Sequence, residues 1–267
     1  SHSRRDTNSV FVSLNQAWAG QHIEASARRD DDDTFGARTT GSVGYALPLW
    51  NGGPLVSATV GRGVRAPTFY DLFGPASQFY QPNPGLGPER SRSREVSLRS
   101  QSTPALRWRV TAFDNRIEDL IVYVSPTVLN VNRARIRGVE VAADGEIAGV
   151  SWRASATFQR PRDDATGLRL PGRAQHHGML DASRRFSAWT TGLTVYASGD
   201  RYDAPGEAGA SRLSPYTLVD ARLRYQVNKM LAIDLAATNL GDRRYETSVG
   251  YDGARRGVML SVRFDAF

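Results

Sequence analysis

Polar and apolar residues alternate along most of this chain. The C-terminal segment GVMLSVRFDAF places Val258, Leu260, Val262 and Phe264 on one face, and Met259, Ser261, Arg263 and Asp265 on the other. The segments VSWRASATFQ, TLVDARLRY and LAIDLAATN follow the same period of two. Because successive side chains of a β-strand point to opposite faces, this period predicts strands that are apolar on one face and polar on the other.

About thirteen segments show this alternation, and helical periodicity is nearly absent. The predicted strands cover residues 8–18, 21–30, 36–47, 54–63, 92–101, 105–123, 134–146, 148–160, 173–181, 186–198, 215–226, 230–240 and 255–266. The sequence therefore predicts an all-β protein.

The lengths of the connections alternate as well. Short links such as AGQ, PLWNGG, EIAG, DASRR and QVNK fall at about every second junction. Longer polar loops lie between them, at residues 64–91, 124–133, 161–172, 199–214 and 241–254. Tight turns at one edge and long loops at the other are typical of a transmembrane antiparallel β-barrel, whose tilted strands of about ten residues cross the hydrocarbon layer. Its apolar face meets lipid and its polar face lines the lumen.

Composition narrows the class further. The chain has no cysteine, so it has neither disulfides nor thiolate metal sites. Its formal charge is +7, but Lys229 is the only lysine and the arginines are spread along the chain, so we expect no nucleic-acid partner. No run approaches the roughly 18 apolar residues of a membrane-spanning helix. The first residues, SHSRRDTNSV, do not resemble a signal peptide.

A terminal aromatic residue is a usual end of an outer-membrane barrel. Phe267, however, is out of phase with Phe264 in the predicted last strand. We expect either a bulge near Asp265 or a short tail that leaves the strand.

Five segments occur in the order and spacing of a known family. They are VGRGVRAPTFYDLFG, NPGLGPERSRSREVSL, FDNRIEDLIVY, NVNRARIRGVEVAAD and TNLGDRRYETSVGYDGARRGVML. Together they resemble the C-terminal barrel half of the TonB-dependent outer-membrane receptors, and most closely the cobalamin receptor branch. The resemblance covers nearly the whole chain, although siderophore receptors share most of these motifs.

This resemblance implies a barrel of 22 strands, an internal plug and a Ton box that is pulled by the energy-transducing protein TonB. Residues 1–267 would supply about thirteen of those strands as one partial barrel domain, without the plug. An odd number of strands cannot close an ordinary antiparallel barrel, so we expect a fragment that does not transport by itself. The implied location is the outer membrane of a Gram-negative bacterium, in contact with lipid and lipopolysaccharide.

The resemblance also places the ligand above the barrel, among the loops. The residues that we expect to contact it are Arg65, Phe69, Tyr70, Tyr80, Tyr202, Tyr245 and Tyr251, with Tyr216 close by. Aromatic side chains there could cover a large amphipathic ligand, or could belong to an interfacial aromatic belt. Arg65 to Phe69 and the motif Asn83 to Leu86 could also serve only to shape a loop.

Other polar groups favour structural roles. Asp30, Asp31, Asp32 and Asp33 are weak calcium candidates, and a solvated turn is the alternative. His176 and His177 point to opposite faces of a strand, which disfavours joint metal binding. Asn239 and Asp242 are expected to satisfy backbone groups at a strand end. The charged residues predicted to face the lumen and pair with one another are Arg107, Arg109, Arg153, Arg222, Arg224, Glu140, Asp220 and Asp234.

The sequence thus predicts the barrel part of an active-transport receptor for cobalamin or a related corrinoid. A ferric siderophore receptor is the alternative, and a passive porin-like or structural barrel is the second. An enzyme is not expected, because none of the four histidines (His2, His22, His176 and His177) lies in a convincing Ser, His and Asp constellation. No cofactor is implied beyond the possible calcium ion.

Overall fold

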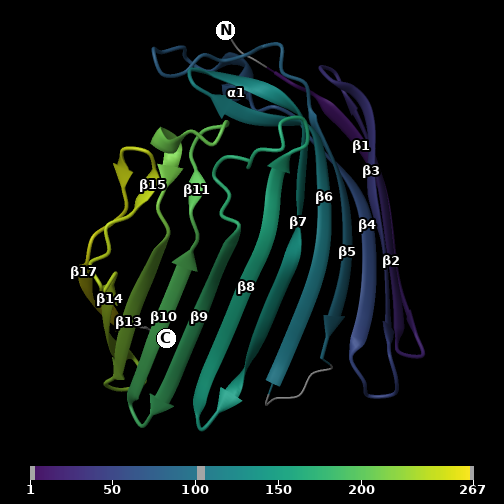
Figure 1. Ribbon diagram of the computed structural model, residues 1–267. Helices are drawn as coiled ribbons and strands as arrows, with labels where there is room; N and C mark the ends of the chain where they lie inside the picture. Colours follow the sequence, from purple (N-terminus) through teal and green to yellow (C-terminus); the bar gives the residue numbers. More distant parts are fainter. Residues whose placement is uncertain (1–3, 101–105, 265–267) are drawn as a thin grey trace.

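Thirteen strands form one antiparallel sheet in the order of the sequence (Figure 1). The structure, a computed structural model, describes residues 4–100 and 106–264, and only the backbone of residues 131 and 132. The strands of the sheet are β1 (Thr7–Trp18), β2 (Gln21–Asp32), β3 (Gly36–Pro48), β4 (Leu55–Arg65), β5 (Glu89–Arg99), β6 (Leu106–Val124), β7 (Thr127–Ile147), β8 (Val150–Asp163), β9 (His176–Phe186), β10 (Trp189–Ser198), β13 (Tyr216–Gln226), β14 (Leu231–Thr238) and β17 (Gly257–Phe264).

The remaining elements are short and lie in the loops. They are helix α1 (Phe69–Phe73), the 3₁₀ turn η1 (Gly209–Ser211), and the paired strands β11 (Arg201–Tyr202) with β12 (Arg212–Leu213) and β15 (Glu246–Ser248) with β16 (Tyr251–Asp252). Within the described residues, no helix has the length and apolarity needed to cross a membrane.

All thirteen predicted strands are confirmed, with corrections at their ends. The loop predicted at 124–133 was wrong, because β6 and β7 continue to a two-residue turn at Ser125 and Pro126. The link predicted at DASRR was also wrong, because these residues complete β9 and the chain turns at Ser187 and Ala188. In both extensions, apolar residues pack or pair with residues of the neighbouring strand. Such long-range pairing decides where a strand ends, and local turn propensity does not reveal it. The expectation for Phe267 lies outside the described residues.

The two edges of the sheet differ, as the loop lengths predicted. Tight turns join β1 to β2, β7 to β8 and β9 to β10 at the bottom of Figure 1, and the loops that carry α1, β11 and β15 lie at the top. In outer-membrane barrels the short turns are periplasmic and the long loops are extracellular. We name these the turn end and the loop end.

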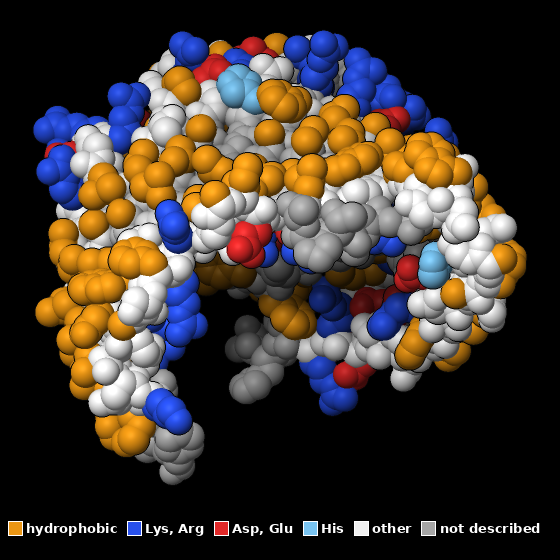
Figure 2. All heavy atoms as spheres, turned by 90° about the horizontal axis from the view of Figure 1, so that it is seen from below, with side chains coloured by type: hydrophobic (Ala, Val, Ile, Leu, Met, Phe, Trp, Pro, Cys, Tyr) orange, Lys and Arg blue, Asp and Glu red, His pale blue; other side chains and the backbone are white. Residues whose placement is uncertain are grey.

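The sheet is curved, and its two faces differ in polarity. Figure 2 shows apolar side chains over much of the convex surface and charged side chains inside the hollow. On the concave face, ion pairs join Arg224 of β13 to Asp234 of β14 at 2.7 Å and Arg107 of β6 to Asp144 of β7. Arg222 of β13 reaches across β10 to Asp181 of β9 at 2.8 Å. The register also places Arg109, Arg153, Glu140 and Asp220 on this face. The predicted inward orientation of these charges is therefore confirmed, and within the predicted set Arg224 pairs with Asp234.

Tryptophans gather on the convex face near the turn end. Trp18 lies 6.5 Å from Tyr45 between ring centroids, and Trp189 lies 4.5 Å from Tyr225. Trp108 and Trp152 occupy the same face near the starts of β6 and β8. Aromatic girdles of this kind mark the interfaces of a barrel with the membrane. The girdle fixes the periplasmic limit of the apolar band.

The sheet has two open edges. Among the described residues, β1 pairs only with β2, and β17 pairs only with β14. Seen from the turn end in Figure 2, the molecule is an open arc. The described strands therefore form an open, curved sheet.

Candidate ligand-binding site

The loop that follows β4 folds onto the β6–β7 hairpin. Thr68 is the N-cap of helix α1. Its hydroxyl accepts from the backbone N–H of Asp71, and the Asp71 carboxylate accepts from the backbone N–H of Thr68. This capping box fixes the turn that aims Leu72 inward. Leu72 packs with Leu86 and Val128 in a buried apolar cluster. The cluster fixes α1 at the loop end.

A bidentate ion pair anchors the base of this loop. Nε and Nη2 of Arg65 each donate to a carboxylate oxygen of Glu89 at 2.7 Å. Glu89 is 8% exposed, and it also accepts from the backbone N–H of Ile121 at 2.7 Å. The pair joins β4, β5 and β6. Arg65 thus holds the wall together, whether or not a ligand also touches its exposed side.

An aromatic surface surrounds α1. The rings of Tyr70 and Tyr80 lie 4.7 Å apart, and the ring of Tyr123 stacks on Tyr80 at 6.3 Å. The Tyr80 hydroxyl donates to the carbonyl of Tyr70 at 2.9 Å. Phe69 is 43% exposed beside the guanidinium of Arg5, which lies 5.3 Å from its ring centroid. Tyr70 and Phe69 therefore present open faces, and Tyr80 supports them.

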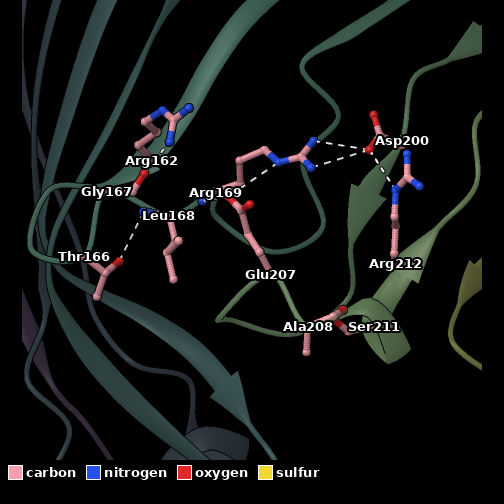
Figure 3. Close-up of polar contacts among 10 residues, drawn as sticks. All are labelled: Arg162, Thr166, Gly167, Leu168, Arg169, Asp200, Glu207, Ala208, Ser211 and Arg212. Atoms are coloured by element: carbon pink, nitrogen blue, oxygen red, sulfur yellow. Dashed lines mark hydrogen bonds and ion pairs between the residues drawn. The ribbon is translucent and has the colours of Figure 1, made fainter.

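A charged cluster ties the loop after β8 to the loop after β10 (Figure 3). Arg169 reaches Asp200 at 3.4 Å and Glu207 at 3.5 Å, and Arg212 donates to the same Asp200 oxygen at 3.2 Å. The guanidinium of Arg169 also lies 4.4 Å from the ring centroid of Tyr202. Burial opposes ionisation of Asp200, but the hydrogen bond from Arg212 and the charge of Arg169 outweigh it and lower the pKa of this carboxyl.

Asp203 joins the loop after β10 to the loop after β14. Its carboxylate accepts from the hydroxyl of Ser248 at 2.7 Å and from the backbone N–H of Val249 at 2.9 Å. Arg201 donates to the carbonyl of Glu246 at 2.7 Å across the same junction. These bonds hold the β15–β16 hairpin against β11.

Tyrosines line this junction. Tyr245 stacks on Tyr216 at 4.5 Å, and Tyr216 lies 5.9 Å from Tyr196. A Cβ atom at Gly253 would lie 2.1 Å from the Tyr245 ring, so the close packing requires glycine there. Tyr251 is 71% exposed. Tyr245 therefore packs within the loop and stabilises it, whereas the ring of Tyr251 is exposed and accessible to a ligand.

Asn239 and Asp242 have the backbone roles expected from the sequence, and both have positive φ. The Asn239 amide donates to the carbonyls of Arg243 and Ala254 at 2.9 and 3.0 Å. The Asp242 carboxylate accepts from the Arg255 side chain and from the backbone N–H of Arg256. The Arg255 hydrogen bond lowers the pKa of Asp242.

We expect the loops to loosen only in acid. Asp200 and Asp242 have a lower pKa when the loops are docked than the ordinary value of 3.8, so their stabilisation is present above that value and is lost as the pH falls through the docked-state pKa. Limited proteolysis of the loops should therefore stay constant from neutrality to about pH 5 and rise below about pH 4. Loosening that begins near pH 6 would point to histidine instead.

The acidic run does not form a metal site. Asp30 accepts from Ser9, Asp32 accepts from the backbone N–H groups of Thr34 and Phe35, and Asp31 lies on the opposite face. Within the described residues, no three His, Cys, Asp or Glu side chains are placed to hold a metal ion. The geometry gives the calcium hypothesis no support.

The predicted contact residues fall into two groups at the loop end. Arg65, Phe69, Tyr70 and Tyr80 surround α1, and Tyr202, Tyr245 and Tyr251 lie on the loops after β10 and β14. Sequence reasoning missed the side chains that hold them, which are Glu89, Tyr123, Arg169 and Asp203. A signal existed only for Glu89, an acid next to a prolyl residue at the start of a strand.

Comparison with known proteins identifies the fold. The family model described as TonB dependent receptor-like, beta-barrel matches residues 1–240. A vitamin B12 transporter BtuB of Vibrio vulnificus is 31% identical over 256 residues, covering 93% of this chain and 40% of the transporter. A BtuB of Photobacterium profundum is 28% identical and covers 97% of this chain and 43% of that protein.

Solved structures agree. The ferric enterobactin receptor PfeA of Pseudomonas aeruginosa superposes with a TM-score of 0.80 at 18% identity, over 97% of this chain and 45% of that receptor. The copper transporter OprC superposes with a TM-score of 0.79 at 17% identity, over 97% of this chain and 47% of that protein. The chain spans less than half the length of these relatives, which are transporters and receptors rather than enzymes. The chain is a β-barrel protein of the Gram-negative outer membrane and belongs to the TonB-dependent receptor family.

Proposed function

We propose that this chain forms the wall and part of the capture surface of a receptor for cobalamin or a related corrinoid. The observation that carries the proposal is the 31% identity with a vitamin B12 transporter over 93% of the chain. Transport would draw energy from TonB through a plug and Ton box, as the family resemblance implies. The chain itself contributes strands and loops.

Exposed aromatic faces would make the ligand contacts. Tyr70 and Tyr251 are 55% and 71% exposed, and each stands on a loop that is fixed by other contacts. Phe69 and Arg65 extend the surface beside α1, and Tyr80, Tyr202 and Tyr245 position it. Rigid aromatic rings bury a large area at small entropic cost, which suits a large ligand with apolar and polar parts.

A ferric siderophore is the alternative ligand. The similarity to the enterobactin receptor PfeA, at 18% identity, concerns the fold and does not bear on the ligand. A passive porin-like barrel is the second alternative. It would conduct ions without an energy source, and single-channel recording distinguishes it from a gated receptor.

Ligand binding tests the proposal. We expect the native protein, extracted from outer membranes in mild detergent, to bind cyanocobalamin saturably and without competition from ferric enterobactin. The double variant Tyr70→Ala/Tyr251→Ala should bind about tenfold or more weakly, because truncated aromatic anchors cost this much in other binding surfaces. Equilibrium dialysis with radiolabelled ligand gives both affinities.

The variant Tyr225→Ala is the matched control, because Tyr225 lies in the aromatic girdle at the turn end. It should bind as the unmodified protein does. Binding of ferric enterobactin in place of cyanocobalamin would favour the alternative receptor, and equal affinity of the double variant would remove Tyr70 and Tyr251 from the site.

A further inference from the structure

The convex face of β4 to β8 carries arginines where the apolar band ends toward the loop end. Figure 2 shows positive side chains on the upper right of the convex surface, beyond the apolar side chains. The residues are Arg62, Arg90, Arg92, Arg94, Arg116, Arg133, Arg135, Arg137, Arg160 and Arg162, which we call the arginine face. Among the described residues, the acids beside them are Asp114, Glu118 and Asp164, so ten positive and three negative charges leave a net +7.

Strand register shows that these arginines point outward. Arg62 follows the convex residue Val60 by two positions, and Arg160 follows the convex residue Phe158 by two. Pairing of β4 with β5, of β5 with β6 and of β7 with β8 is continuous through the arginine face, without a bulge. The alternation of side chains is therefore unbroken, and the arginines share the lipid-facing side with the valines and phenylalanine.

Five of the arginines lie directly opposite one another across the strands. The register pairs Arg62 with Arg92, Arg92 with Arg116, Arg116 with Arg135, and Arg135 with Arg162. Like charges directly opposite in a sheet are destabilising. An external anion bound between these side chains would offset the repulsion.

Protein carboxylates offset only part of it. The Asp114 carboxylate accepts hydrogen bonds from Nε and Nη2 of Arg135, each at 2.7 Å, and lies 3.8 Å from Nε of Arg116. The side chains of Arg62 and Arg92 make no hydrogen bond or ion pair within the part of the chain that the structure describes. Between these side chains lies a hollow of about 350 Å³, lined by six arginines and the three acids.

The height of the arginine face matches the outer headgroup layer. Arg160 follows Trp152 of the turn-end girdle by eight residues along β8. At about 3.3 Å per residue and a tilt of about 40°, the arginine lies roughly 20 Å above the girdle, near the far side of an apolar band about 25 Å tall. Arginine is costly on the lipid face at the membrane centre and cheap at the interface, so this placement is the tolerated one.

The arginine face is local and does not form a ring around the wall. On β10, the residue eight positions from the girdle residue Trp189 is Ala197. On β13, the residue eight positions from the girdle residue Tyr225 is Thr217, so neither strand has an arginine at this height. The strands that carry it, β4 to β8, lie in the middle of the sheet, away from both open edges. Further strands added at those edges would leave the arginine face exposed to the membrane.

We propose that the arginine face binds the phosphate groups of a phosphorylated lipid in the outer leaflet. The occupant is a lipid because the site faces sideways into the membrane, directly above lipid-facing apolar residues. It is phosphorylated because guanidinium groups pair bidentately with phosphate, and the paired arginines supply several such forks at close spacing. The acyl chains would then lie along Val96, Val139 and Phe158, which are 54%, 39% and 58% exposed.

Native mass spectrometry of the protein, extracted in mild detergent, tests this with bisphosphorylated lipid A as the probe. We expect bound lipid A on the unmodified protein, and about tenfold or more weaker binding by Arg90→Gln/Arg92→Gln/Arg94→Gln, because each basic side chain at a membrane surface adds to the attraction for anionic lipid. Dephosphorylated lipid A should bind the unmodified protein as weakly as bisphosphorylated lipid A binds the variant.

The matched control is Arg99→Gln/Arg109→Gln/Arg153→Gln, which removes the same charge from the concave face. It should retain lipid A. Heated and unheated gel electrophoresis confirms that both variants are folded. Equal lipid A binding by the first variant, or equal binding of the dephosphorylated lipid, would overturn the proposal, as would displacement of lipid A by inorganic phosphate alone without a membrane lipid.

Discussion

Replacing Gly138 with alanine is expected to prevent β7 from pairing with β8 as it does here. A Cβ atom at this position would lie 2.3 Å from the carbonyl oxygen of Phe158 and 2.9 Å from Cα of Gln159. These are backbone atoms, so no side-chain rotation relieves the clash. Overpacking of this kind costs about 1 to 3 kcal/mol and occasionally more, and backbone contacts place Gly138 toward the upper end. The fraction of protein that runs as the folded form on unheated gels should fall sharply.

Gly44→Ala is the control for this prediction. Gly44 also lies within a strand and on the concave face, but a Cβ atom there would lie 3.2 Å from the Thr59 hydroxyl, at the end of a side chain. We expect at most about 1 kcal/mol of destabilisation. If the two variants unfold at the same urea concentration, the close approach at Gly138 does not limit the pairing.

The strands could be predicted because lipid imposes one rule on every one of them. Leu235 pairs with Leu260 on the lipid-facing side and must be apolar. Its sequence neighbour Asp234 can be charged because it meets Arg224 in the hollow. This rule is local and repeats with a period of two. The rule does not apply at the loop end, where β6 and β7 leave the membrane and α1 covers them, so the sequence there predicts a loop instead of strand extensions.

The site was predicted only in part, because long-range contacts build it. The tyrosines were visible as aromatic residues in long loops. Their supports were not, since Asp203 meets Ser248 at a separation of 45 residues and Asn83 meets Val128 at the same separation. The arginine face was hidden for a similar reason. RSRSR is a polar run in the sequence, and only the register places Arg92 opposite Arg62 and Arg116.

Asp203→Ala is expected to release the loop after β14 and to weaken ligand binding. The half-buried carboxylate of Asp203 accepts hydrogen bonds from the Ser248 hydroxyl and from the Val249 backbone N–H. Hydrogen bonds to a charged group contribute about 1.5 to 3 kcal/mol in buried settings. With partial exposure, a loss of about 2 kcal/mol would increase the undocked population about thirtyfold. Protease cleavage within residues 239–256 should accelerate accordingly, with or without ligand.

Asp252→Ala separates this effect from loss of charge. Asp252 lies exposed in the same hairpin and makes no ion pair within the described residues, so cleavage should stay unchanged. Because Asp203 fixes Tyr251 relative to Tyr202 without contacting a ligand in our proposal, its variant should also bind cyanocobalamin about tenfold more weakly. Faster cleavage with unchanged affinity would show that the loop after β14 is held by Asp203 but takes no part in capture. Unchanged cleavage would show that Arg201 and the Tyr216–Tyr245 stack suffice to dock the loop.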